Sequence, residues 1–204
     1  MPFVKSNAPA NTGPAPRDMG ADVAHLQSGD LETRWNAARA LGGCAEAVPA
    51  LAAALAAEHA PQVREALATA LLRVGNEASV AALIPHIRSP DAALRAIAIE
   101  ALQALPDATR PFMQRLLADD DMDVRILALE LLRGMPAAEA TRLACGVLER
   151  EQHPNVCAAA IDVLAETGTP VAVPVLRACA SRFAGTPFIP FAVSAAIARI
   201  SAES

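Results

Sequence analysis

The chain has 204 residues, 53% of them hydrophobic, and a formal net charge of −5. This composition excludes a wholly disordered chain, and it excludes a surface rich enough in positive charge to neutralise nucleic-acid phosphates. The apolar residues are mostly Ala and Leu, with one Trp, no Tyr and five Phe, which favours closely packed helices over sheets. We therefore predict an all-α protein that binds no nucleic acid.

The cysteines and the hydropathy pattern indicate where the protein resides. The four cysteines form no C-x-x-C pair and lie inside apolar helical patterns, where a free thiol behaves as a small buried hydrophobe. The N-terminus lacks a signal-peptide profile, and no run of roughly 18 apolar residues is present. We expect a cytoplasmic protein in a reducing compartment, with no membrane association. The cysteines are Cys44, Cys145, Cys157 and Cys179.

The first 20 residues differ from the rest of the chain in composition. They contain four prolines among Ser, Asn, Thr and Gly, a mixture with little to bury. We predict a flexible Pro-rich tail over residues 1–20 and one solenoid over residues 21–204.

From residue 21 onward an apolar pattern recurs every 30 to 33 residues. Each copy predicts a helix with apolar residues at positions 0, +4 and +8, which lie on one side of a helix of 3.6 residues per turn. Such periods are typical of stacked helical units. Position 0 is Thr33, Val63, Leu94, Val124, Val156 and Ile189; position +4 is Ala37, Leu67, Ala98, Ala128, Ala160 and Val193; position +8 is Leu41, Leu71, Leu102, Leu132, Leu164 and Ile197.

A first helix precedes each of the last five of these second helices. Pro49, Pro111 and Pro174 suit first turns, whereas Pro85 falls inside a helical pattern and predicts a kink. Glycines follow the second helices and suit left-handed terminating residues. The result is about six antiparallel helix pairs. The predicted first helices cover 48–55, 80–87, 111–117, 141–148 and 173–180, and the glycines are Gly42, Gly43, Gly75, Gly134 and Gly168.

An Asp followed four residues later by an Arg opens three of the second helices. The pairs are Asp30/Arg34, Asp91/Arg95 and Asp121/Arg125. We interpret them as acid–base pairs within one helical turn, a stabilising arrangement, and not as catalytic groups. Arg64 lacks the acid, and we expect it to bond to loop carbonyls or to a neighbouring unit.

These pairs, the Ala/Leu frame and the segments Ala47-Val-Pro-Ala-Leu51 and Ala172-Val-Pro-Val-Leu176 resemble the HEAT-repeat family, in particular the short bacterial units of phycobilisome lyases. The resemblance covers about residues 21–204 and implies a right-handed α-α superhelix whose second helices line the concave surface. It is specific for architecture and weak for activity. Cys157 and Pro190 replace the Arg, so we expect the last two units to lack the polar ladder.

Two clusters raise the possibility of metal binding. Asp119, Asp120, Asp121 and Asp123 supply oxygen ligands, but a calcium loop also needs a turn Gly and a late bidentate Glu. His153 and Cys157 stand four apart without the paired spacing of zinc sites. We predict a solvated helix start for the first and no metal for the second, and no cofactor for the chain.

The outer face of the second helices, at positions +2 and +6, is the candidate binding surface. Glu100, Glu130 and Asp162 would form an acidic stripe there that suits a basic or amphipathic segment of another protein. The alternative reading is that Glu is a soluble helix former at exposed positions. The predicted partner-binding residues are Trp35, Arg39, Glu65, Glu100, Ile126, Glu130, Asp162 and Phe191.

The sequence thus predicts a non-enzymatic scaffold or adaptor that binds another protein on its concave face, in bacterial signalling or assembly. The alternative is a bilin lyase or related chromophore-handling enzyme, although one Trp and no Tyr supply few flat walls for a pigment. Phe183, Phe188 and Phe191 crowd the last unit, where they cap the core or form a homodimer contact.

Overall fold

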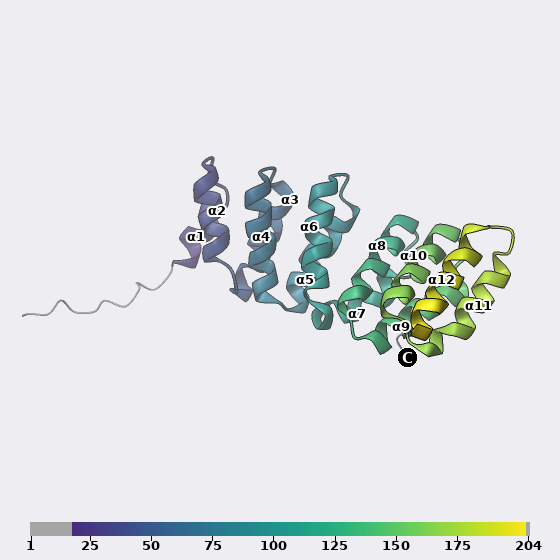
Figure 1. Cartoon of the computed structure of the whole chain (residues 1–204). Coiled ribbons are helices and arrows are strands. Elements are labelled where there is room, and N and C mark those ends of the chain that lie inside the picture. The colour runs from purple at the N-terminus through teal and green to yellow at the C-terminus, as the bar shows by residue number, and fades with distance from the viewer. Residues whose placement is uncertain (1–17, 203–204) are drawn as a thin grey trace, which may run out of the picture.

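The computed structural model describes residues 18–202, and this part of the chain contains α-helices and short 3-10 helices but no strands. Figure 1 shows the helices following one another in a row from the N-terminus to the C-terminus. Consecutive helices form six pairs, which we call units 1 to 6. These are α1 (Met19–His25) with α2 (Leu31–Ala40), α3 (Val48–Ala57) with α4 (Pro61–Val74), α5 (Glu77–Leu83) with α6 (Ala92–Gln103), α7 (Pro106–Leu116) with α8 (Met122–Leu131), α9 (Ala137–Arg150) with α10 (Pro154–Thr167), and α11 (Val173–Arg182) with α12 (Phe188–Ala202).

Four 3-10 helices supplement these pairs in the described part of the chain. The predicted right-handed α-α solenoid of about six helix pairs is confirmed. Helix α1 begins at Met19, because the Asp18 side chain accepts hydrogen bonds from the backbone N–H groups of Gly20 and Ala21. Met19 and Gly20 are therefore helical and Asp18 is their cap, and residues 1–17 of the predicted tail lie outside the described residues. The 3-10 helices are η1 (Ala45–Ala47), η2 (Ile84–Arg88), η3 (Leu132–Gly134) and η4 (Pro170–Ala172).

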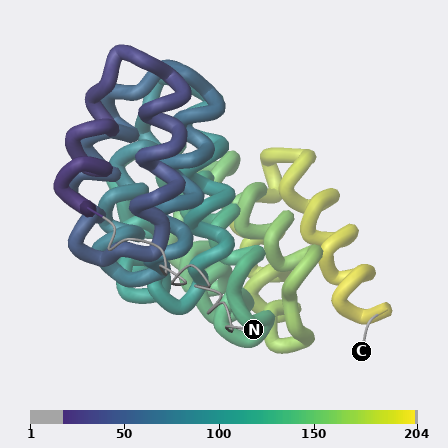
Figure 2. The backbone as a smooth tube through the Cα atoms, turned by 90° about the vertical axis from the view of Figure 1, so that its left-hand side faces the viewer, coloured from purple at the N-terminus to yellow at the C-terminus, as the bar shows by residue number. Residues whose placement is uncertain are grey.

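The predicted frame of the second helices forms the core. Sixteen of its eighteen residues are buried; Thr33 and Ile197 are half-buried. In α12 the buried stripe moves to Ile200, and this helix packs against α10 and α11. Figure 2 shows how the units stack into one continuous array.

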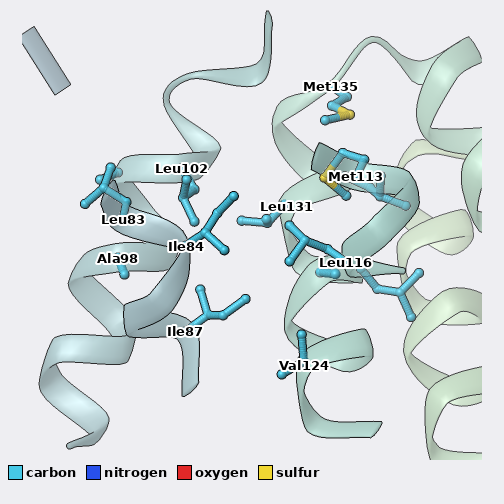
Figure 3. Packing of buried hydrophobic residues seen from close by; sticks show 14 of the residues in the cluster. Leu83, Ile84, Ile87, Ala98, Leu102, Met113, Leu116, Val124, Leu131 and Met135 are labelled. Atoms are coloured by element: carbon cyan, nitrogen blue, oxygen red, sulfur yellow. The ribbon is translucent and has the colours of Figure 1, made fainter. Parts of the chain in front are cut away.

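The junction between units 3 and 4 joins two halves of the array. Figure 3 shows Ile84, Ile87 and Leu102 of unit 3 facing Leu131 and Leu116 of unit 4, and all five side chains are buried. Across the same junction Gln103 Nε2 donates a hydrogen bond of 2.9 Å to the Glu130 carbonyl. Dispersion and burial of apolar area therefore hold the halves together.

The proline predictions are confirmed at two first turns and corrected at one. Pro49 and Pro174 occupy the first turns of α3 and α11. Pro111 lies inside α7, because that helix already begins at Pro106. At Pro85 the α-helix gives way to η2, since the ring removes a backbone donor and the chain tightens into a 3-10 turn.

The glycine prediction holds for Gly43 and Gly75, which have φ values of 89° and 65°. Gly42, Gly134 and Gly168 are not left-handed, so the prediction was wrong for them. A Cβ on Gly134 would clash with the Gln103 carbonyl oxygen of the preceding unit. Gly134 thus serves close packing between units rather than an unusual backbone angle.

The predicted Asp/Arg pairs within one turn are wrong, because the partners lie elsewhere. Asp30 caps α2 by accepting from the Thr33 N–H at 2.7 Å, and Asp121 caps α8 in the same manner. Each following arginine instead bonds to a carbonyl six residues earlier. These bonds are Arg34 to Ser28, Arg64 to Glu58, Arg95 to Ser89 and Arg125 to Asp119, at 2.6 to 2.9 Å.

Three of these arginines also reach an acid in the loop of the next unit. We call such an arginine with its acid a rung. The rungs are Arg34–Glu58 at 2.7 Å, Arg64–Asp91 at 2.5 Å and Arg125–Glu151 at 2.8 Å. Both expectations for Arg64, a loop carbonyl and a neighbouring unit, are therefore confirmed. Between units 3 and 4, Arg88 pairs with Asp119.

The rungs fix the charge of their acids. The hydrogen bond from Arg34 and those from the His59 and Ala60 N–H groups lower the pKa of Glu58 to about 2. Glu151 accepts from Arg125 and from the Gln152 and His153 N–H groups, and its pKa is also lowered. Each loop therefore keeps an ionised carboxylate in place for the arginine of the preceding unit.

Candidate functional site

The second helices present a continuous outward surface, the second-helix face, formed by positions +2, +6 and +9 of each frame. Two neighbouring cavities indent this face in units 1 to 3, one between α2 and α4 of about 230 Å³ and one between α4 and α6 of about 400 Å³. Both are lined by Glu65 and Thr69 of α4. Because they share these residues, the two cavities lie side by side along α4, and we call the two together the α2–α6 groove.

One end of the groove carries an aromatic stack. The Arg39 guanidinium lies 4.4 Å from the centroid of the Trp35 ring, at the i and i+4 positions of α2. This cation–π contact holds both side chains over the opening between α2 and α4. Trp35 and Arg39 thus line the same cavity as Glu65, and their role in binding stays a prediction.

The other end of the groove is acidic and partly apolar. Glu65 and Glu100 line the cavity between α4 and α6 together with Leu72 and Ile97. Both glutamates are exposed, and within residues 18–202 neither forms an ion pair. Two carboxylates beside apolar side chains can attract a cationic group and cover its aliphatic stem.

The predicted acidic stripe changes character in the second half. Arg133 bonds to Glu130 at 2.9 Å, to Asp162 at 2.8 Å and to Glu166 at 2.5 Å. These bonds raise the pKa of Arg133 still further above its usual range, with the bond to Glu130 the largest cause. Three carboxylates share one guanidinium here, so Glu130 and Asp162 are engaged within the protein whereas Glu100 is not.

Arg133 was absent from the predicted site, although the sequence contains a signal for it. It occupies position +9 of its frame, which lies on the same side of an ideal helix as +2 and +6. Leu72, which lines the groove, and Gln103, which bonds to Glu130, also occupy +9. Extending the frame by one position would have identified these residues.

The remaining two predicted residues lie apart from the groove. Ile126 is half-buried and lines a separate depression of about 420 Å³ with Arg95 and Asp123. Phe191 is 77% exposed on α12. Among its neighbours, Phe183 packs against the core, as capping requires, whereas Phe188 remains exposed.

The other candidate residues have structural partners. Asp119 pairs with Arg88, and His153 caps α10 by accepting from the Asn155 N–H. Among the described residues, no three His, Cys, Asp or Glu side chains are placed to hold a metal ion. Nor does any helix in this part of the chain have the length and apolar character needed to cross a membrane.

Comparison with known proteins finds similar solved structures and a matching family. Solved structures similar to the chain include the CpcE–CpcF complex of phycocyanin lyase from Nostoc sp. PCC7120, with 29% identity, a TM-score of 0.46, and coverage of 86% of this chain and 74% of that one. A designed armadillo repeat protein in complex with the peptide (KR)4 has 15% identity, a TM-score of 0.45, and coverage of 90% and 100%. No curated protein matches the sequence.

The family described as HEAT repeats matches residues 23–103 and 109–182. Because these two matches cover most of the sequence, the chain belongs to the HEAT-repeat family.

Proposed function

We propose that this protein is a non-enzymatic scaffold that binds a segment of another protein in the α2–α6 groove. The observation that carries the proposal is the pair of adjacent cavities over three units, with Glu65 lining both and unpaired carboxylates facing outward. A stack of preformed helices presents such a surface with little rearrangement on binding. The proposal places the protein in an assembly or signalling role.

The chemistry of the groove defines the partner segment. Glu65 and Glu100 favour a Lys or Arg side chain, and Leu72 and Ile97 provide apolar contact for its stem. At the other end the Trp35 ring offers a flat surface already covered by Arg39, which favours an acidic or aromatic group of the partner. A short segment with a basic residue and a neighbouring aromatic residue meets both requirements.

The second half contributes differently to the proposed binding. Because Arg133 holds Glu130 and Asp162, a basic segment must displace an existing ion pair to reach them. Displacement offsets part of the attraction. We therefore assign the principal contact to units 1 to 3 and keep Ile126 and Phe191 as secondary contacts.

Affinity capture with matched variants tests the proposal. A Glu65→Arg/Glu100→Arg variant should lose partners that the wild-type protein retains. The control is Glu77→Arg/Glu149→Arg, which changes the net charge equally at exposed residues of the first helices α5 and α9. Equal retention of partners by the wild type and the groove variant, with both folded, would contradict the assignment.

A photocrosslinker at Thr69 provides an independent test, since this residue lines both cavities. The crosslinked partner should be the protein lost by the groove variant. Its crosslinked peptide should contain a basic residue next to an aromatic one. Crosslinks to a protein that binds the groove variant equally well would place the binding surface elsewhere.

A further inference from the structure

Two buried thiols meet between units 5 and 6. Cys157 on α10 and Cys179 on α11 are 0% and 1% exposed. Both are free cysteines, and their thiols interact directly with each other. Two nucleophilic groups from different units are thus in contact inside the core.

The pair occupies the place that a rung has in earlier units. Cys157 is position +1 of its frame, where units 1 to 4 have arginine. Its Sγ lies 3.7 Å from the Glu151 carbonyl, six residues earlier, which is the same bond that each arginine makes. Three of the four earlier arginines then reach a loop acid of the next unit, whereas Cys157 reaches Cys179 of unit 6.

Arg182 covers the pair from the outside. Its Nη2 lies 2.5 Å from the Leu148 carbonyl, 3.1 Å from the Glu151 carbonyl and 4.0 Å from Cys157 Sγ. Arg182 itself is exposed, so the group that touches Cys157 extends to the protein surface. The hydrogen bond from Cys157 and the charge of Arg182 lower the pKa of Cys179, and the same interaction raises that of Cys157.

We propose that Cys157 and Cys179 form a reversible intramolecular disulfide when the protein meets hydrogen peroxide, a covalent rung between units 5 and 6. The Cys179 thiolate attacks one peroxide oxygen, the O–O bond breaks, and the leaving hydroxide takes a proton to become water. Cys157 sulfur then attacks the resulting sulfenic acid, the S–S bond forms, and a second water leaves with the thiol proton. The two thiols lose two electrons in total, and the peroxide gains them.

The other two cysteines serve as internal controls. Cys44 and Cys145 are half-buried and lie in different units. Burial and the nearby Glu149 raise the pKa of Cys145, which makes its thiol less reactive. Neither has a second thiol beside it in the described part of the chain, so oxidation of either cannot produce the same product.

The experiment uses the full chain, reduced and then treated with hydrogen peroxide. The number of titratable thiols should fall from four to two. Trypsin cleaves after Arg150, Arg177 and Arg182, so the disulfide should join peptides 151–177 and 178–182. The intact mass should drop by that of two hydrogen atoms, and dithiothreitol should reverse the change.

Variants and a stability measurement complete the test. Cys44→Ser/Cys145→Ser should still form the joined peptide, and its melting temperature should rise on oxidation because the crosslink constrains the unfolded chain. Cys179→Ala should lose the joined peptide. Oxidation of Cys44 or Cys145 in the wild type without the joined peptide would overturn the proposal, and this result does not depend on the folding of any variant.

Discussion

Units 1 to 3 and units 4 to 6 share one buried frame but differ on the second-helix face. In the first half, Glu65 and Glu100 border an open groove and are not paired. In the second half, Arg133 gathers Glu130, Asp162 and Glu166. The difference teaches that the core positions define the repeat, whereas the outer positions are free to carry binding in one half and internal ion pairs in the other.

The largest effect should come from breaking what the halves share. Ala98 in the first half and Ala128 in the second occupy position +4 and are both 0% exposed. Replacement of either by Asp buries an unpaired charge, and we expect each to lower the free energy of unfolding by about 3–5 kcal/mol. Denaturant unfolding measures this, with the exposed Ala96→Asp as control. Normal stability of Ala128→Asp would show that the frame is out of phase in the second half.

The junction between the halves should be the next most sensitive place. Gly134→Ala forces a Cβ against the Gln103 carbonyl oxygen, and overpacking of this kind costs about 1–3 kcal/mol. A Cβ on Gly185 meets no atom within 4 Å, so Gly185→Ala is the matched control. If the two variants melt at the same temperature, the halves do not approach as closely as described.

Acid should weaken rungs in both halves. The pKa of Glu58 is lowered from 4.5 to about 2, so its stabilising effect is present above about pH 4.5 and is lost as the pH falls through about 2. The lowered pKa of Glu151 predicts the same direction in the second half. Glu58→Gln and Glu151→Gln should each flatten the acid limb of a plot of unfolding free energy against pH. A wild-type curve with no slope in this range would contradict the rung description.

The smallest effect on stability should come from the ion-pair network of the second half. Arg133→Ala removes the centre of a partly exposed ion-pair network, which is worth less than about 1 kcal/mol and is screened by salt. Thermal melting at low and high salt measures it. The same variant frees Glu130 and Asp162, so the second half should come to resemble the first in binding a basic segment. Unchanged binding would indicate that the apolar lining of the groove, and not charge alone, distinguishes the halves.

Much of the fold was predictable because the core depends on helix periodicity. Leu67, Ala98 and Leu132 are buried where a period of 3.6 residues places them. Helix starts at Asp30, Asp91 and Asp121 follow equally from a local signal, the capping side chain.

The rungs were not predictable from the same signals. Arg34 pairs with Glu58, 24 residues away, because the stacking of units places the next loop beside it, closer than its own Asp30. Arg133 and Gly134 likewise act on neighbouring units. Within the candidate site, the frame predicted which residue types lie on the outer face of each helix. The contact of α4 with both α2 and α6 could not be predicted, because it depends on how the units stack in three dimensions.

The rungs also have a consequence for how such a protein can grow. Each rung joins a donor and an acceptor, with the arginine in one unit and the acid in the loop between the two helices of the next. A duplicated unit inserted at such a joint could pair its arginine with the acid of the following unit. Its own acid could pair with the arginine of the preceding unit. Lengthening by gene duplication is therefore compatible with the three joints that carry a rung, whereas units 3 and 4 are joined by Arg88 and Asp119, and unit 5 has Cys157, beside Cys179, in place of the arginine.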